Sequence, residues 1–121
     1  MHIDRYDVAL TTIADGSVTA YTPFVSGRVL AVGYVKTDFD NGVDITVSTE
    51  TTTRTIVALT NQNTSVLVHP RVAVQDAAGA DATLDGTRSM REPAHVCNER
   101  VKIVVAQGGN VKTGSVYVLV G

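Results

Sequence analysis

The chain has 121 residues, a formal net charge of −2 and 44% hydrophobic residues, with only 5% aromatic residues and no Trp. This size fits one domain whose core is built from Val, Ile, Leu and Ala. The charge is balanced, and no cluster of Lys and Arg is longer than a pair, which disfavours direct contact with nucleic acid or with an anionic membrane.

Val and Thr recur from one end of the chain to the other. Both are β-branched and favour strands over helices. We therefore expect a single all-β domain over residues 1–121.

Cysteine usage and the first residues indicate the compartment. Cys97 is the only cysteine, so an internal disulfide is excluded and a reducing compartment is expected. The opening residues MHIDR carry charges and are followed by no apolar run long enough for a signal peptide or a membrane helix. We expect synthesis and use in a cytosol.

The first third of the chain predicts three strands. Residues 5–13 and 17–22 are joined by Asp15-Gly16, a pair that favours the positive φ of a tight hairpin. Pro23 then interrupts the ladder, which indicates an edge or a corner between sheets. Residues 27–37 (GRVLAVGYVKT) are apolar on both faces, as in a strand covered on both sides, and Gly33 inside them marks a bulge or a close backbone approach.

The middle of the chain predicts further short strands. DFDNG (38–42) is a turn, and the strict alternation over 43–50 predicts an antiparallel strand with one face exposed to water. Residues 53–60 predict another strand. Residues 66–74 contain Pro70 and predict either two short strands or one edge strand bent at His69-Pro70.

Residues from about 76 to 95 differ from the rest, because they are rich in Ala, Gly and Asp and lack periodicity. They predict a long loop, with room for a short helix at 81–84. Loops of this length are commonly functional or fold against a partner. We expect this loop to contact a neighbouring chain, with Arg88 and Arg91 as polar anchors; the alternative is an exposed mobile loop.

The last residues, ERVKIVVAQGGNVKTGSVYVLVG (99–121), predict two strands, 100–106 and 111–120, paired as a hairpin around Gln107-Gly108-Gly109-Asn110. The final strand is apolar on both faces, so it lies inside the sandwich or under another subunit. The whole pattern predicts seven to nine short antiparallel strands in a β-sandwich or jelly roll, with a small barrel as the alternative.

Candidate metal sites are weak. His95 and Cys97 share one strand face, but zinc needs two more ligands, so we interpret them as a loop-end histidine and a small buried thiol. Two carboxylate sets resemble calcium loops without the EF-hand spacing and are interpreted as solvated turns: Asp38, Asp40 and Asp44, and Asp76, Asp81 and Asp85.

Catalytic motifs are absent from the sequence. It contains no Gly-x-Ser-x-Gly elbow, and the glycine-rich QGGN joins two strands rather than a strand and a helix, so it offers no helix N-terminus to a phosphate. We expect no enzymatic activity, no metal and no cofactor.

Three stretches carry a resemblance to a known family: DGSVTAYTPFVSGRVLAVGYVKTDFDNGVDITVSTE (15–50), HPRVAV (69–74) and the final 99–121. They resemble a family of small proteins encoded among the virion structural genes of tailed bacteriophages. The resemblance implies a virion component, closest to the capsid cement or decoration proteins, which are often jelly rolls or sandwiches. It brings no catalytic residues.

The resemblance thus implies a protein made in the host bacterial cytoplasm that binds across neighbouring major capsid subunits at the capsid surface, as a homotrimer or homodimer. One alternative is a head-tail connector or a tail- or baseplate-associated β-domain. Another is a carbohydrate-binding module on the virion, which would need exposed aromatic side chains among Tyr6, Tyr21, Phe24, Tyr34, Phe39 and Tyr117.

Overall fold

The computed structural model describes residues 2–83, 86–88 and 90–121, and in these residues the regular elements are all β-strands. None of the described residues belongs to a helix that could span a membrane. The predicted all-β class is confirmed.

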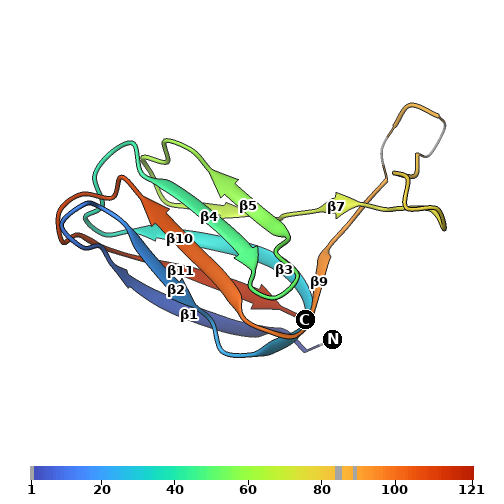
Figure 1. Cartoon of the computed structure of the whole chain (residues 1–121), viewed down its shortest axis with the longest axis horizontal. Coiled ribbons are helices and arrows are strands. Elements are labelled where there is room, and N and C mark those ends of the chain that lie inside the picture. The colour runs from blue at the N-terminus through green and yellow to red at the C-terminus, as the bar shows by residue number, and fades with distance from the viewer. Residues whose placement is uncertain (1, 84–85, 89) are drawn as a thin grey trace.

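Two antiparallel sheets face each other as a β-sandwich (Figure 1). The first sheet has five strands: β1 (Asp4–Thr11), β11 (Thr113–Val120), β3 (Val25–Lys36), and then β6 (Val66–Val68) and β9 (Ala94–Glu99), which pair with different halves of β3. The second sheet has four: β2 (Val18–Tyr21), β10 (Val101–Ala106), β4 (Asp44–Thr49) and β5 (Thr55–Leu59). Two short strands outside the sandwich, β7 (Val72–Ala73) and β8 (Arg91–Glu92), form a separate ribbon.

The core lies between the sheets and follows the predicted alternation. In β4 every second residue, Ile45, Val47 and Thr49, is buried, and the residues between them are half-buried. The two central strands contribute in the same way: Val101, Ile103 and Val105 from β10, and Val116, Val118 and Val120 from β11. Because β11 lies between β1 and β3, the last strand is interior, as one of the two predictions had it.

Both predicted terminal hairpins are wrong. β1 and β2 lie in different sheets, and so do β10 and β11, so the turns at Asp15-Gly16 and at 107–110 cross from one sheet to the other. β1 pairs instead with β11 over eight residues, from Asp4↔Val120 to Thr11↔Thr113. Turn residues predict that the chain reverses direction. They do not predict whether the two strands that follow and precede the turn pair in one sheet or lie in two facing sheets.

Gly33 marks a close approach, although of a side chain rather than of a backbone. Its register partner in β11 is Tyr117, and a Cβ on Gly33 would lie 2.0 Å from Cζ of that ring. The guanidinium of Arg5 in turn lies 4.1 Å from the Tyr117 ring centroid. The ring therefore covers a glycine on the outer face of the five-stranded sheet.

Two of the three prolines, Pro23 and Pro70, carried a prediction, and both act as predicted. Pro23 lies in the corner between β2 in one sheet and β3 in the other, and Pro70 separates the two short strands β6 and β7.

The turns at one end of the sandwich are bonded to one another. Gly108 N donates to the Gly16 carbonyl at 2.8 Å, and Asp40 N donates to the Gly108 carbonyl at 3.0 Å. Gly108 is buried here, and a Cβ on it would lie 2.8 Å from Cγ2 of Thr12. QGGN is thus a packed connection between the two sheets. Its hydrogen bonds join the turns at the end of the sandwich that lies opposite the projecting β7–β8 ribbon (Figure 1).

Candidate interaction site at the projecting arm

Residues 72–92 leave the sandwich as an arm, of which residues 84, 85 and 89 lie outside the described part (Figure 1). β7 and β8 pair through Val72↔Glu92 and Ala73↔Arg91, so the predicted loop range of 76–95 holds β8 and the first residues of β9. The ribbon continues outward, since Val74 N donates to the Met90 carbonyl at 3.0 Å. The arm is therefore a hydrogen-bonded ribbon rather than an irregular loop.

The outer part of the arm is a turn organised by Asp76. Its Oδ1 accepts from Ala78 N at 2.9 Å and from Ala80 N at 3.1 Å, and Gly79 has a φ of 84°. Asp81 forms a bridge with Gln75, so residues 81–83 are extended and the helix considered at 81–84 is not present in them. Leu84, like Asp85 of the second carboxylate set, lies outside the described residues.

The arm has little core of its own. Its apolar residues Val72, Val74 and Ala82 are only half-buried, and the Met90 side chain is 41% exposed. Burial of apolar surface therefore contributes little to its order, and backbone hydrogen bonds carry most of it. Such a segment gains burial when it packs on a neighbouring molecule.

The two arginines predicted as anchors both lie on this arm. Arg91 is in β8 and exposed, opposite Ala73, and Arg88 is exposed farther along the arm. Neither belongs to the cleft described next.

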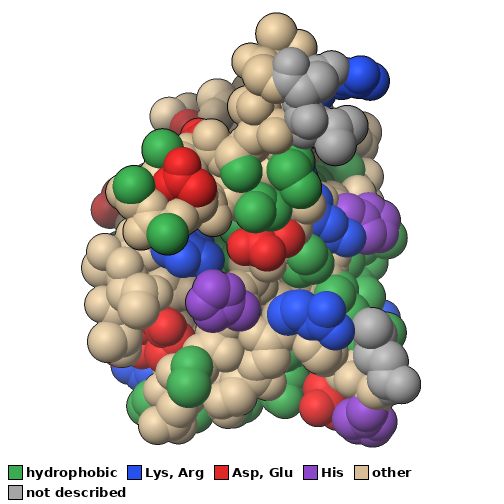
Figure 2. Space-filling view, turned by 90° about the vertical axis from the view of Figure 1, so that its right-hand side faces the viewer, with side chains coloured by type: hydrophobic (Ala, Val, Ile, Leu, Met, Phe, Trp, Pro, Cys, Tyr) green, Lys and Arg blue, Asp and Glu red, His purple; other side chains and the backbone are tan. Residues whose placement is uncertain are grey.

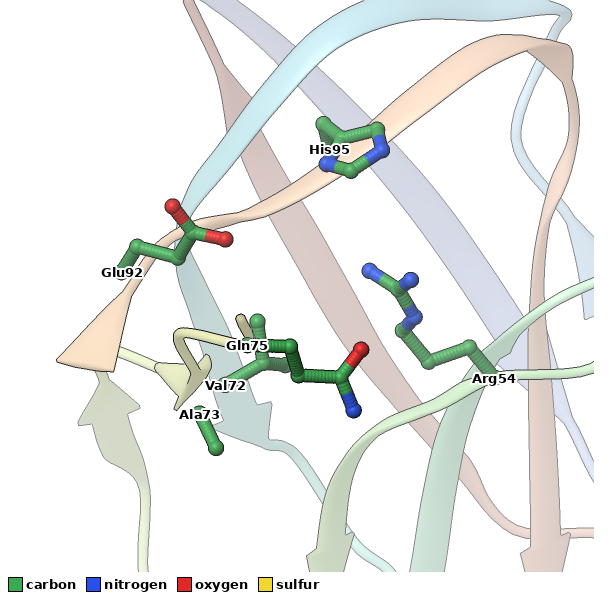
Figure 3. Close-up of a pocket in the computed structure, with 6 residues that line it drawn as sticks. All are labelled: Arg54, Val72, Ala73, Gln75, Glu92 and His95. Carbon is green, nitrogen blue, oxygen red and sulfur yellow. The ribbon is translucent and has the colours of Figure 1, made fainter. Parts of the chain in front are cut away.

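A cleft of about 320 Å³ separates the base of the arm from the sandwich, lined by Arg54, Val72, Ala73, Gln75, Glu92 and His95. Figure 3 shows that the Arg54, Gln75 and His95 side chains come from three different segments and converge on the same space, whereas Glu92 lies at the other side of it. Apolar Val72 and Ala73, both from β7, complete the lining. No sequence pattern links these residues, which is why only His95 was considered beforehand, and for zinc.

The backbone beneath Arg54 is held firmly. Arg54 N donates to Thr49 Oγ1 at 2.9 Å, and Thr49 N donates to the Arg54 carbonyl at 2.9 Å. The preceding turn rests on the buried carboxylate of Glu99, whose Oε1 accepts from the amides of Thr51 at 3.0 Å and Thr52 at 3.2 Å. Arg54 therefore projects into the cleft from a fixed base.

The residues considered as metal ligands have other surroundings. Cys97 is exposed, so the prediction of a buried thiol is wrong. Cys97 lies two residues after His95 on β9, and both side chains point to the exposed face of the strand. Asp38 accepts from both N and Oγ1 of Thr113, and these hydrogen bonds hold the pKa of its carboxyl below the usual value. Asp44 accepts from Asn61 N at 2.9 Å. Within the described ranges, no group of three His, Cys, Asp or Glu side chains is placed to hold a metal ion.

A second surface feature joins two aromatic rings to an ion pair. The Arg100 guanidinium lies 4.1 Å from the ring centroid of Tyr21 and 5.8 Å from that of Phe24, and it contacts both carboxylate oxygens of Glu50 at 2.5 Å. The hydrogen bond from Arg100 lowers the pKa of Glu50. Phe24 is 65% exposed, which makes it the most open aromatic ring among the large exposed hydrophobic side chains.

The end of the molecule that carries the arm mixes side chains of all kinds (Figure 2). Basic, acidic, histidine and hydrophobic groups alternate over this face without a continuous field of one sign. The recognition expected here is therefore local and geometric rather than long-range.

No protein-family model matches the chain, and no curated protein does either.

Proposed function

We propose that this chain is a structural virion protein of a tailed phage, a capsid cement or decoration protein that binds across neighbouring major capsid subunits. The observation that carries the proposal is the arm: a hydrogen-bonded ribbon that projects from a rigid sandwich and leaves its own apolar residues partly uncovered. The resemblance of residues 15–50, 69–74 and 99–121 to phage virion proteins supports the same role.

The physical demands of this role agree with the fold. A cement protein needs a rigid body and a projecting element that reaches a second subunit, and no catalytic chemistry. Attachment at many equivalent positions of a symmetric shell multiplies weak contacts through effective concentration, so each copy needs only modest affinity. A dimer or trimer of the chain would present several arms to the shell at once.

Cosedimentation with expanded heads of the encoding phage tests the proposal. The purified protein is expected to pellet with the heads and to saturate at a fixed ratio to the major capsid protein. Replacing both arm arginines (Arg88→Ala with Arg91→Ala) should weaken binding by about tenfold, since two contacts made by exposed charges are together worth about 1–2 kcal/mol. Arg5→Ala is the matched control, because Arg5 pairs with Asp7 on β1, outside the arm.

Absence of binding to heads would overturn the proposal, and unchanged binding by the double variant would remove the two arginines from it. Electron microscopy of labelled particles distinguishes the related alternatives. Cement covers the shell, a head-tail connector occupies one vertex, and a tail or baseplate domain lies beyond it.

One observation favours a second candidate, a carbohydrate-binding surface at Phe24 and Tyr21, because sugar rings stack on exposed aromatic faces. Against it, the Arg100 guanidinium already occupies a face of the Tyr21 ring. A glycan array probed with the protein and with Phe24→Ala decides this: a signal lost in the variant favours the carbohydrate role, and silence removes it.

A further inference from the structure

We propose that the cleft between the arm and the sandwich binds a carboxylate side chain, Glu or Asp, on an extended segment of the partner protein. The inference rests on the proposed function, in which the arm end meets a neighbouring chain, and it names the chemistry of that contact.

Arg54 is the primary group. Arg5 pairs with Asp7 and Arg100 pairs with Glu50, whereas Arg54 takes part in no ion pair with another described residue. Its guanidinium instead points into a concave space (Figure 3). A planar guanidinium with open donors is the side chain best suited to bidentate binding of a carboxylate.

Two further polar side chains line the same cleft. His95 carries a ring N–H donor on the side of Arg54, whereas Gln75 turns its amide oxygen toward Arg54 and its NH2 group away from it (Figure 3). Arg28 is the register partner of His95 in the β3–β9 ladder, so both side chains stand on the same sheet face. Arg28 therefore adds positive charge beside the cleft.

Glu92 determines how such a ligand is oriented. It lies across the cleft from Arg54 (Figure 3) and repels a second negative charge. Its carboxylate accepts N–H groups, which a polypeptide backbone offers and a bare anion does not. The cleft therefore suits a carboxylate carried on a peptide, with the acid at Arg54 and the backbone toward Glu92.

The donors are held in place before any ligand arrives. Arg54 is bonded through its backbone to Thr49, His95 lies in the β9 ladder, and Gln75 takes part in a bridge with Asp81. Fixed backbones reduce the entropy lost on binding, so a small open cleft can still select its ligand.

Titration by NMR with N-acetyl-glutamate N-methylamide tests the inference, with the corresponding glutamine compound as the uncharged comparison. We expect the glutamate compound to shift the resonances of Arg54 and His95 with saturation, and the glutamine compound to bind at least about tenfold more weakly. Arg54→Gln should lower affinity by about tenfold, and Glu92→Gln should raise it roughly threefold. Arg5→Gln, which removes the same charge elsewhere, should leave it unchanged.

Equal binding of the two compounds, or unchanged affinity in Arg54→Gln, would overturn the inference. Circular dichroism of each variant establishes that it is folded. Because the titration needs no capsid, its failure is separable from that of the proposed function: heads that bind protein whose cleft ignores glutamate contradict only the cleft, whereas a working cleft without head binding contradicts only the capsid role.

Discussion

Tyr34 is the residue whose environment is least favourable within the core. It is 2% exposed, its ring stacks on Phe39 with 6.2 Å between centroids, and its hydroxyl is a buried polar group for which the described residues provide no hydrogen-bond partner. A buried hydroxyl without a partner costs about 1–3 kcal/mol.

Replacing Tyr34 with Phe should therefore stabilise the protein by about 1 kcal/mol, because the ring contacts remain and the unpartnered oxygen is removed. Urea unfolding at neutral pH measures the change. A loss of stability of similar size would show instead that the hydroxyl is satisfied in solution.

The same residue predicts a response to alkali. Burial raises the pKa of Tyr34 above its value in the unfolded chain. The free energy of unfolding does not depend on this group below the unfolded pKa of about 10. It decreases as the pH rises from there through the folded pKa, because the unfolded state releases the proton first. The Tyr34→Phe variant should lack this part of the alkaline destabilisation.

The arm is the element to which the proposed capsid role assigns the contact with a partner. Its apolar residues lie outside the core cluster, and Ala73 and Arg91 are opposite one another at its base. Replacing residues 74–90 by Asn-Gly, which suits a two-residue turn, closes the ribbon at that pair. The melting temperature should change by no more than about 5 °C, whereas binding to phage heads should be lost.

Thermal unfolding followed by circular dichroism, together with head cosedimentation, measures both effects on the same protein. Loss of cooperative unfolding would show that the arm belongs to the folding unit, and retained head binding would exclude the arm as the docking element.

At the scale of the whole molecule, stability depends on carboxylates in three separate connections. Hydrogen bonds from Ser17, Thr113 and Arg100 lower the pKa values of Asp15, Asp38 and Glu50 respectively. A depressed folded pKa gives stability that is complete above the unfolded pKa and is lost as the pH falls through the folded one.

The protein should therefore become easier to unfold below about pH 4, where carboxyl groups of the unfolded chain take up protons. Urea midpoints measured from neutral pH down to about pH 3 check this dependence. Asp38→Asn should flatten part of the decline. A flat profile in the parent protein would show that these carboxyl groups have the same pKa in the folded and the unfolded chain, which would contradict the prediction.

Part of the candidate site was foreseeable and part was not. The composition of residues 76–95 marked the segment that departs from the sandwich, and Arg88 and Arg91 lie on it as expected. The cleft residues Arg54, Gln75 and His95 were not foreseeable as a group. They come from positions far apart in the sequence, and only the pairing of β9 with β3 and the projection of the arm bring them together.

The sequence by itself determined what depends on neighbouring residues. Alternation over 43–50 predicted β4, β-branched composition predicted an all-β chain, and Pro23 and Pro70 predicted a corner and a break, because side-chain direction and backbone restriction act over a few residues. Tertiary structure alone decided which strands pair. The turns at 14–17 and 107–110 could each close a hairpin or join two sheets. Burial of apolar side chains from distant parts of the chain favoured the second arrangement, in which β1 pairs with β11 and β2 pairs with β10.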